Sequence, residues 1–148
     1  MAHTYTNLIY HVVFSTEGHI RSLTKERRAE LFAYLAALIK EKKGLPLIIN
    51  GVEDHVHLLF ELPPSVALSD VMRFLKANSS RWFKERFEIP FAWQTGFGAF
   101  SVSRSVVPKV SDYIRDQEEH HKKRGFRAEF IALLNKSGVD IDEDDLWK

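Results

Sequence analysis

Two apolar runs meet at an Asn-Gly pair near the middle of the chain. The first run ends at Asn50-Gly51, and the second begins at His55. Asn-Gly between two such runs is a strong hairpin signal, and the connection can extend over the next three residues. We therefore expect antiparallel strands near 47–52 and 55–62. Because side chains alternate along a strand, His55 and His57 must point to the same face of the sheet.

The other elements follow from periodicity. Alternating apolar residues predict a first strand over 5–16. A 3.6-residue repeat predicts helices over 25–43 and 68–87, and the aromatic segment 91–103 predicts a fourth strand, bulged at its glycines. The order β-α-β-β-α-β predicts an α+β fold of the ferredoxin-like, RRM-like type. In that fold two helices cover one face of a four-stranded antiparallel sheet.

A further helix is expected on the C-terminal side of this unit, over 105–124. It carries Tyr113 and, four residues later on the same helical face, Gln117. A short helix near 126–136 and an acidic tail at about 139–148 complete the chain. No linker or repeat divides the 148 residues, so we expect a single domain from 1 to 148.

The two histidines allow two interpretations. They can be polar residues on a solvated strand face, or they can be half of a metal site held on a rigid element. Imidazole binds manganese, zinc, copper, nickel or iron through a neutral ring nitrogen. If His55 and His57 point away from the two helices, the site lies on the open face of the sheet. The sequence does not decide which face of the sheet the two histidines are on, because both strand faces carry apolar residues.

Tyr113 is the candidate nucleophile. It can instead be structural, with its ring packed against the apolar residues of its own helix. An isolated phenol titrates near pH 10, so it attacks poorly unless a cation or a base stabilises the phenolate. A metal ion at the histidines can supply that stabilisation if the two elements pack together. The amide oxygen of Gln117 is then a candidate third ligand.

This set of donors is neutral, so a bound cation keeps its full charge and can polarise a phosphodiester oxygen. Two nitrogens favour Mn²⁺ on ligand type, whereas Mg²⁺ is favoured by its abundance. We expect one of these two ions and no organic cofactor.

Composition narrows the classes further. The chain has no cysteine, which excludes disulfides and thiolate sites. It has no apolar run of the about 18 residues that a membrane span requires and no signal-peptide pattern, so we expect a cytoplasmic protein without a membrane partner. Five of the 20 acidic residues and one of the 21 basic residues lie in the last nine positions, which leaves the rest of the chain at about +5. This asymmetry is a weak indication of a polyanionic partner, and charge alone slightly favours the alternative of an ordinary solvated surface.

The second predicted helix carries basic residues on one side. Arg73, Lys76, Arg81 and Lys84 are candidates for contacts with DNA phosphates. The alternative is an ordinary solvated basic face. His120, His121, Glu118 and Glu119 are predicted to be solvent-facing or to complement a helix end, with no catalytic role.

Four motifs together resemble one family. They are Gly51-Val-Glu-Asp-His55-Val-His57-Leu-Leu, Ser79-Ser-Arg-Trp82, Trp93-Gln-Thr-Gly-Phe-Gly-Ala-Phe-Ser and Tyr113-Ile-Arg-Asp-Gln117-Glu-Glu-His-His. In this combination the chain is similar to the single-tyrosine HUH transposases of small bacterial insertion sequences, which are related to the REP-associated tyrosine transposases. The resemblance extends over nearly the whole chain.

The resemblance implies a role for each matching residue. His55, His57 and Gln117 would bind a divalent metal, and Tyr113 would attack single-stranded DNA at hairpin-bearing element ends. The product would be a 5′-phosphotyrosine and a free 3′-hydroxyl, which can reseal the strand without ATP. Members of this family act as homodimers, and the tyrosine helix can complete the site of the partner subunit.

Two other functions fit parts of the sequence. One is a non-catalytic, domesticated protein that binds nucleic acid on the same sheet. The other is a zinc-dependent phosphodiester hydrolase, in which metal-bound hydroxide attacks and the tyrosine is structural.

Overall fold

The fold is a four-stranded antiparallel sheet with helices on both faces. The computed structural model describes residues 3–142. In chain order the elements are β1 (Ile9–Ser15), η1 (Glu17–His19), α1 (Lys25–Glu41), β2 (Leu45–Gly51), β3 (His55–Glu61), α2 (Leu68–Phe87), β4 (Gly98–Val102), η2 (Arg104–Val106), α3 (Val107–Arg115), α4 (Gln117–His121) and α5 (Phe126–Lys136). The strand order β2-β3-β1-β4 with antiparallel neighbours confirms the predicted α+β, ferredoxin-like arrangement.

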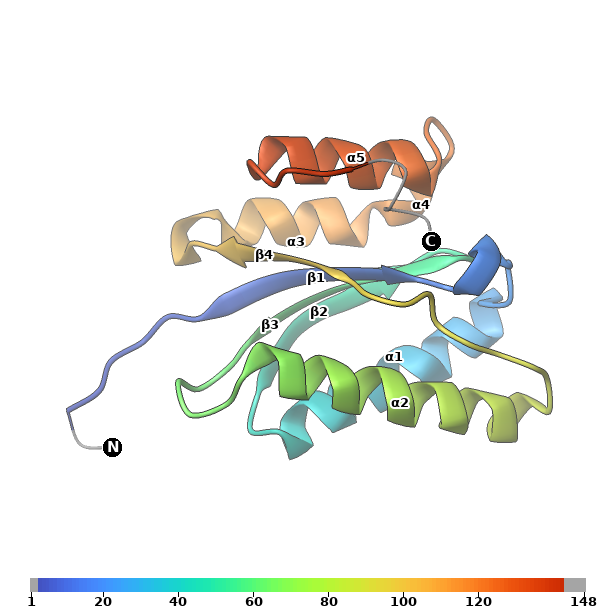
Figure 1. The fold of residues 1–148 in the computed structure, drawn as a ribbon, viewed down its shortest axis with the longest axis horizontal. Helices are drawn as coiled ribbons and strands as arrows, with labels where there is room; N and C mark the ends of the chain where they lie inside the picture. Colours follow the sequence, from blue (N-terminus) through green and yellow to red (C-terminus); the bar gives the residue numbers. More distant parts are fainter. Residues whose placement is uncertain (1–2, 143–148) are drawn as a thin grey trace.

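Figure 1 shows α1 and α2 on one side of the sheet and α3, α4 and α5 on the other. The main core lies between the sheet and α1 and α2, and alternate strand residues such as Val56, Leu58 and Phe60 fill it. A smaller core under α3 contains Leu59 and Ile114. The sequence left open which face of the sheet carries the two histidines. Because Val56, Leu58 and Phe60 face α1 and α2, the alternating residues His55 and His57 lie on the opposite face, which α3 to α5 cover.

The hairpin differs from its prediction in the position of the turn. Asn50 and Gly51 belong to β2, where they pair with His57 and Val56, and the connection is formed by residues 52–54. The Asn50 side chain also links this strand to the next layer. Its Nδ2 donates hydrogen bonds to the carbonyls of Ile114 and Arg115, at 2.9 and 3.0 Å, and so joins β2 to the C-terminal end of α3.

The predicted strand over 91–103 is only partly a strand. Residues 91–97 form a loop that joins β4 to α2, and Trp93 within it makes an isolated bridge to Thr16. The Trp93 indole donates to the Ser79 hydroxyl at 2.9 Å inside the core. Burial of this ring, rather than strand pairing, explains the aromatic pattern that predicted a longer strand. The first strand is also shorter than predicted, since it begins at Ile9.

The predicted helix over 105–124 is divided. It becomes η2, α3 and α4, with Asp116 at φ −93°, ψ 24° between the last two. Tyr113 therefore lies on α3, whereas Gln117 begins α4. The helix predicted near 126–136 is present as α5. Most of the predicted acidic tail lies outside the described residues.

Candidate active site

His55 and His57 lie on β3, one of the two central strands of the sheet, and their side chains are fully buried. Both imidazoles point into the space between the sheet and α3 to α5. His11 of β1 lies beside them. In the antiparallel pairing of β1 with β3, Val13 is opposite His57, and His11, two residues earlier on the same face as Val13, reaches the His57 ring. Three imidazoles thus share one buried face, and two of them come from the predicted motif.

His55 is held in one orientation by the residue before it. Its Nδ1–H donates to Oδ1 of Asp54 at 2.7 Å, so its Nε2 faces the interior of the site. Burial opposes a charge on His55, but its hydrogen bonds with Asp54 and with Glu129 outweigh burial and raise the pKa of His55 above 6.5. A carboxylate behind an imidazole is the usual support of a metal-binding histidine.

His57 is oriented by His11. Nε2 of His11 lies 2.8 Å from Nδ1 of His57, and the two rings stack with centroids 5.1 Å apart. Burial lowers the pKa of His11 to about 3 and that of His57 to about 4. Both rings are therefore neutral at pH 7, and a neutral imidazole is the form that binds a metal ion.

Glu129 of α5 occupies the centre of the cluster. Its Oε1 lies 3.1 Å from Nε2 of His55, of His57 and of His121. Burial would raise the pKa of Glu129, but the hydrogen bonds from these three histidines outweigh burial and lower it far below 4.5. Glu129 is thus a buried, ionised carboxylate, with only 1% of its surface exposed.

Tyr113 reaches the same carboxylate from α3. Its hydroxyl donates to Oε2 of Glu129, and its ring lies against His57 and His120, with centroids 5.8 and 4.7 Å away. Burial, followed by the hydrogen bond and the negative charge of Glu129, raises the pKa of the Tyr113 phenol above 10. In this arrangement the phenol is protonated at neutral pH.

Gln117 lies within the cluster as well. Its Oε1 is 3.3 Å from Nε2 of His55, and its Nε2 donates to Oε2 of Glu129 at 3.2 Å. The structure therefore brings together His55, His57, Tyr113 and Gln117, which the sequence singled out. Their roles as ligands and nucleophile stay predictions.

The position of α5 is fixed by aromatic contacts. Phe126 packs on the His55 ring at 4.3 Å between centroids, and Phe126 stacks on Phe130 at 5.5 Å. Phe130 in turn rests on Gly98 of β4, where an added Cβ would lie 2.5 Å from the ring. The absence of a side chain at Gly98 lets α5 approach the sheet, which brings Glu129 to the histidines.

One prediction about α4 is wrong. His121 does not merely complement a helix end, since its Nε2 contacts Glu129 and its ring lies 4.5 Å from that of His55. Glu118 is exposed, as predicted, and it also accepts a hydrogen bond at 3.1 Å from the buried guanidinium of Arg28. This ion pair joins α4 to α1.

The four basic residues of α2 lie in the layer on the other side of the sheet. Arg73 pairs with Asp70, and Lys76 donates to the carbonyls of Gln94 and Gly96 at 2.6 and 2.5 Å, which ties α2 to the loop before β4. Arg81 donates to Asn78 at 2.5 Å. Their proposed contacts with DNA are not at the histidine cluster and stay a prediction.

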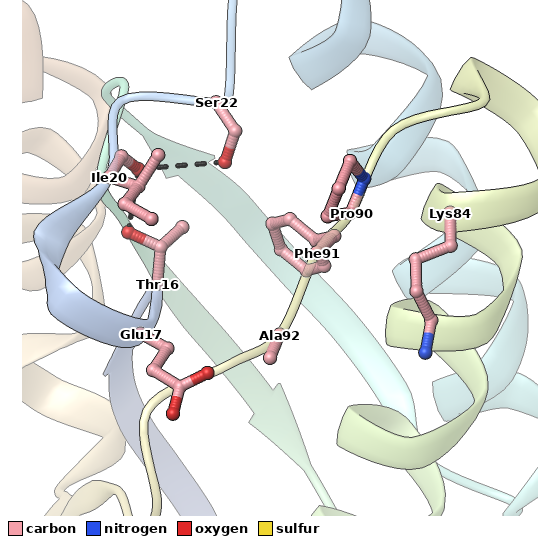
Figure 2. A pocket seen from close by; sticks show the side chains of 8 residues that line it. All are labelled: Thr16, Glu17, Ile20, Ser22, Lys84, Pro90, Phe91 and Ala92. Atoms are coloured by element: carbon pink, nitrogen blue, oxygen red, sulfur yellow. Dashed lines mark hydrogen bonds between the residues drawn. The ribbon is translucent and has the colours of Figure 1, made fainter.

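Lys84 lines a separate cavity of about 350 Å³ (Figure 2). The loop after β1 forms one wall, where Thr16 donates to the carbonyl of Ile20 at 2.8 Å, and Pro90 to Ala92 form another. This cavity contains none of the residues of the histidine cluster.

A larger cavity, of about 550 Å³, opens beside Tyr113. Its walls come from β4, α3 and α5, and His11 and Phe100 contribute aromatic surface. Lys109, Arg124 and Lys136 are among the residues that line it, and all three are exposed. An anionic chain that entered this cavity would meet positive charge next to the phenol.

Glu129 and His121 are the site residues that sequence reasoning missed. Both follow the Tyr-x-x-x-Gln motif, and neither forms a recognisable spacing with the histidines of β3. The one available signal is that Glu129 is an acidic residue in the first turn of α5, among the apolar residues of that helix. That signal alone does not distinguish a ligand from a helix-terminal charge.

Comparison with known proteins gives a consistent result. The model of the family described as "Transposase IS200 like" matches residues 4–117. The transposase for insertion sequence element IS200 from Salmonella typhimurium is 31% identical over 129 residues, which cover 82% of this chain and 84% of that protein. The ISDra2 transposase TnpA from Deinococcus radiodurans is 27% identical over 122 residues, covering 72% and 87% of the two chains.

Similarity extends to solved structures. A REP-associated tyrosine transposase bound to a REP hairpin superposes with a TM-score of 0.62 at 15% identity, covering 80% of this chain and 71% of that one. At this identity the match shows a shared fold. No helix in the described part of this chain is long and apolar enough to cross a membrane.

Proposed function

Because the chain belongs to the family of IS200-like transposases, we propose that it cleaves and rejoins single-stranded DNA at hairpin-bearing element ends through a covalent bond to Tyr113. The observation that carries this proposal is the position of the Tyr113 hydroxyl. It is hydrogen-bonded to a carboxylate that also contacts His55 and His57.

The donor set fits a divalent metal ion. His55 and His57 present Nε2 atoms to one buried point, and the Gln117 amide oxygen lies 3.3 Å from the first of them. Mg²⁺ or Mn²⁺ held by these three residues would polarise a phosphodiester oxygen and reduce the effect of Glu129 on the phenol. Asp54 and His11 hold the two imidazoles in orientation from behind.

The chemistry is a transesterification. The phenolic oxygen of Tyr113 forms a bond to phosphorus while the bond from phosphorus to the 3′ oxygen breaks, so the 5′-phosphate remains on the tyrosine. The phenolic proton passes to solvent in the cavity beside Tyr113 as the bond to phosphorus forms, and the 3′ oxygen takes up a proton as it departs. Attack of a 3′-hydroxyl on the phosphotyrosine reverses these steps and rejoins a strand.

The cavity beside Tyr113 is the proposed path of the strand. Lys109, Arg124 and Lys136 supply positive charge for phosphates, and Phe100 offers a ring face to an unpaired base. The basic residues of α2, namely Arg73, Lys76, Arg81 and Lys84, are proposed to contact the hairpin. Hairpin binding is supported by the similarity to a transposase bound to a REP hairpin.

We further propose that the protein acts as a homodimer in the cytoplasm, where its DNA substrate is. The resemblance to dimeric family members supports this assembly. Within one chain Tyr113 already meets the carboxylate at its own histidines, so a single subunit contains every residue of the proposed reaction.

The proposal is tested with single strands copied from the DNA that flanks the gene, including its palindromes. Each strand carries a 5′ or a 3′ label and is incubated with the protein and Mn²⁺, and the products are separated on a denaturing gel. We expect a slowly migrating protein–DNA band only when the strand carries the 3′ label, because the DNA on the 3′ side of the break stays attached to the protein. This band should be absent in Tyr113→Phe. Cleavage without such a band in either variant would instead indicate a hydrolase that uses metal-bound water.

A further inference from the structure

The helix α5 lies outside the residues that the family model matches, which end at 117. It nevertheless supplies the carboxylate at the centre of the histidine cluster. We propose that Glu129 and His121 are ligands of the metal ion, so that the C-terminal segment adds an anionic donor and a further imidazole to the site. This inference rests on the proposed function, because it assumes that His55 and His57 bind a metal.

Several candidate donor atoms lie close together. Oε1 of Glu129 lies 3.1 Å from the Nε2 atoms of His55, His57 and His121. In a tetrahedral site with metal–ligand bonds of about 2.0–2.1 Å, neighbouring donor atoms are about 3.3–3.4 Å apart. His55, His121 and Glu129 have donor atoms that all lie within 4.8 Å of one another. The donor atoms are therefore gathered at one buried point, and binding of an ion would draw them closer together.

The orientation of each donor is already fixed. The His55 and His57 rings are held from behind by Asp54 and His11, which leaves Nε2 of each ring for the metal. Glu129 is buried, and Phe126 and Phe130 hold its helix against the sheet. Preorientation of this kind lowers the entropic cost of binding an ion.

The two oxygens of Glu129 face different partners. Oε1 faces the imidazoles, whereas Oε2 accepts hydrogen bonds from the Tyr113 hydroxyl and from Nε2 of Gln117. As a ligand through Oε1, Glu129 would keep the Tyr113 oxygen one carboxylate away from the metal ion. The residue is in this sense a metal ligand that also positions the nucleophile.

The donor set also selects the metal. An anionic oxygen with up to three imidazoles suits Mn²⁺, Co²⁺ or Zn²⁺, whereas Mg²⁺ prefers oxygen donors and retains water. The carboxylate reduces the net charge of the loaded site from +2 to +1. We therefore expect Mn²⁺ to bind without DNA and a large excess of Mg²⁺ not to displace it.

The test is the affinity of the DNA-free, full-length protein for Mn²⁺, measured by isothermal titration calorimetry after chelation. The wild type is compared with His57→Ala, Glu129→Gln and His121→Asn. Glu119→Gln, which changes an exposed carboxylate on α4 that pairs with Lys122, is the matched control. We expect Kd to increase at least about tenfold in Glu129→Gln and in His121→Asn, and to stay within about twofold of the wild type in the control.

A second readout reports coordination directly. The visible absorption of bound Co²⁺ depends on the number and geometry of its ligands, so its spectrum should change in Glu129→Gln and recover in part in Glu129→Asp, which restores a carboxylate. If circular dichroism shows that Glu129→Gln is unfolded, His121→Asn decides, because the His121 side chain is partly exposed, at 11%, and its removal disturbs less of the interior.

The two proposals fail in different ways. Unchanged or tighter Mn²⁺ binding by Glu129→Gln, together with loss of binding in His57→Ala, would overturn the ligand role of Glu129 alone. It would mean that Glu129 is only a counter-charge that the metal displaces. Unchanged binding in His57→Ala, or no binding by the wild type, would overturn the metal site of the proposed function as well.

Discussion

The hydroxyl of Tyr113 donates a hydrogen bond to Glu129, and the other oxygen of that carboxylate contacts three imidazoles. The proposed nucleophile and the proposed metal ligands are thereby joined through one side chain of α5. In the metal-free form the phenol is protonated and held in place. A cation at the imidazoles would weaken the effect that keeps it protonated.

Tyr113→Phe should abolish the covalent adduct and strand cleavage while leaving the fold intact. Phenylalanine keeps the ring contacts with His57 and His120, and only the hydroxyl is lost. The lost hydrogen bond to a charged group is worth about 1.5–3 kcal/mol at most, less any replacement by water. Gel assays measure the adduct, and urea unfolding measures the stability. Residual adduct in this variant would show that another residue attacks.

Asn50→Ala should reduce cleavage and stability together. Its side chain satisfies the carbonyls of Ile114 and Arg115, next to the end of the helix that carries Tyr113. Loss of two such bonds is expected to cost about 1–3 kcal/mol in free energy of unfolding. Mn²⁺ affinity should change little, because the proposed ligands on β3 and α5 remain.

Asn135→Ala, at an exposed position on α5, is the control for Asn50→Ala and should change neither cleavage nor stability. Normal cleavage by Asn50→Ala would mean that the position of Tyr113 does not depend on this link.

The metal-free protein should lose stability as the pH falls from about 6.5 to 4. His11 and His57 titrate near 6.5 when unfolded, but burial lowers their pKa to about 3 and about 4 when folded. In this window the unfolded chain binds protons that the folded chain does not, so acid favours unfolding by up to about 1.4 kcal/mol per pH unit for each histidine. The pKa of His55 is raised in the folded protein, so this residue has the opposite effect: its contribution to stability is lost as the pH rises above 6.5.

This pH dependence is measured by urea unfolding in a chelator at pH 6 and pH 5. A His11→Gln variant removes one of the two titrating groups and should show about half the slope. Equal slopes in the variant and the wild type would contradict the assignment.

Chelation should leave the fold intact. In the described part of the chain no buried side-chain nitrogen or oxygen lacks a hydrogen-bond partner, since Glu129 satisfies the histidines when no metal is bound. The far-ultraviolet circular dichroism should therefore not change with EDTA. Mn²⁺ at about 100 times its Kd should then stabilise the protein by about 2.7 kcal/mol. Unfolding by EDTA would mean that the metal is required for folding, contrary to this prediction.

Charge reversals should separate strand binding from hairpin binding. Lys109→Glu with Lys136→Glu changes the cavity beside Tyr113, whereas Arg73→Glu with Lys84→Glu changes the exposed side of α2. The first pair should impair cleavage of the single strand, and the second should weaken binding of the hairpin. The slope of log K against log salt concentration should become shallower by about one unit for each phosphate contact that is lost. Equal effects of both pairs on both substrates would contradict two separate surfaces.

The sequence predicted those features that repeat at short spacing. Strand alternation set His55 and His57 on one face, and the helical repeat identified α1 and α2. The Asn-Gly pair was predicted to form the turn, but Asn50 lies in β2 and bonds to α3. This contact is some sixty positions away in the chain, and local turn preference carries no information about it.

Glu129 and His121 were beyond prediction because their role arises only from the tertiary fold. Neither shares a motif with the residues that it contacts. The approach of α5 to the sheet depends on Gly98 beneath Phe130 and on Phe126 against His55. Such contacts between distant segments leave no periodic signal in one sequence.

The most direct test of the central claim is to identify the residue that becomes joined to DNA. The protein is trapped with Mn²⁺ and a single strand from its own flanking DNA, digested with protease and nuclease, and examined by mass spectrometry. We predict a nucleotide linked through its 5′-phosphate to the peptide that contains Tyr113. A nucleotide on any other residue, or cleaved DNA with an unmodified Tyr113 peptide throughout the time course, would contradict this account.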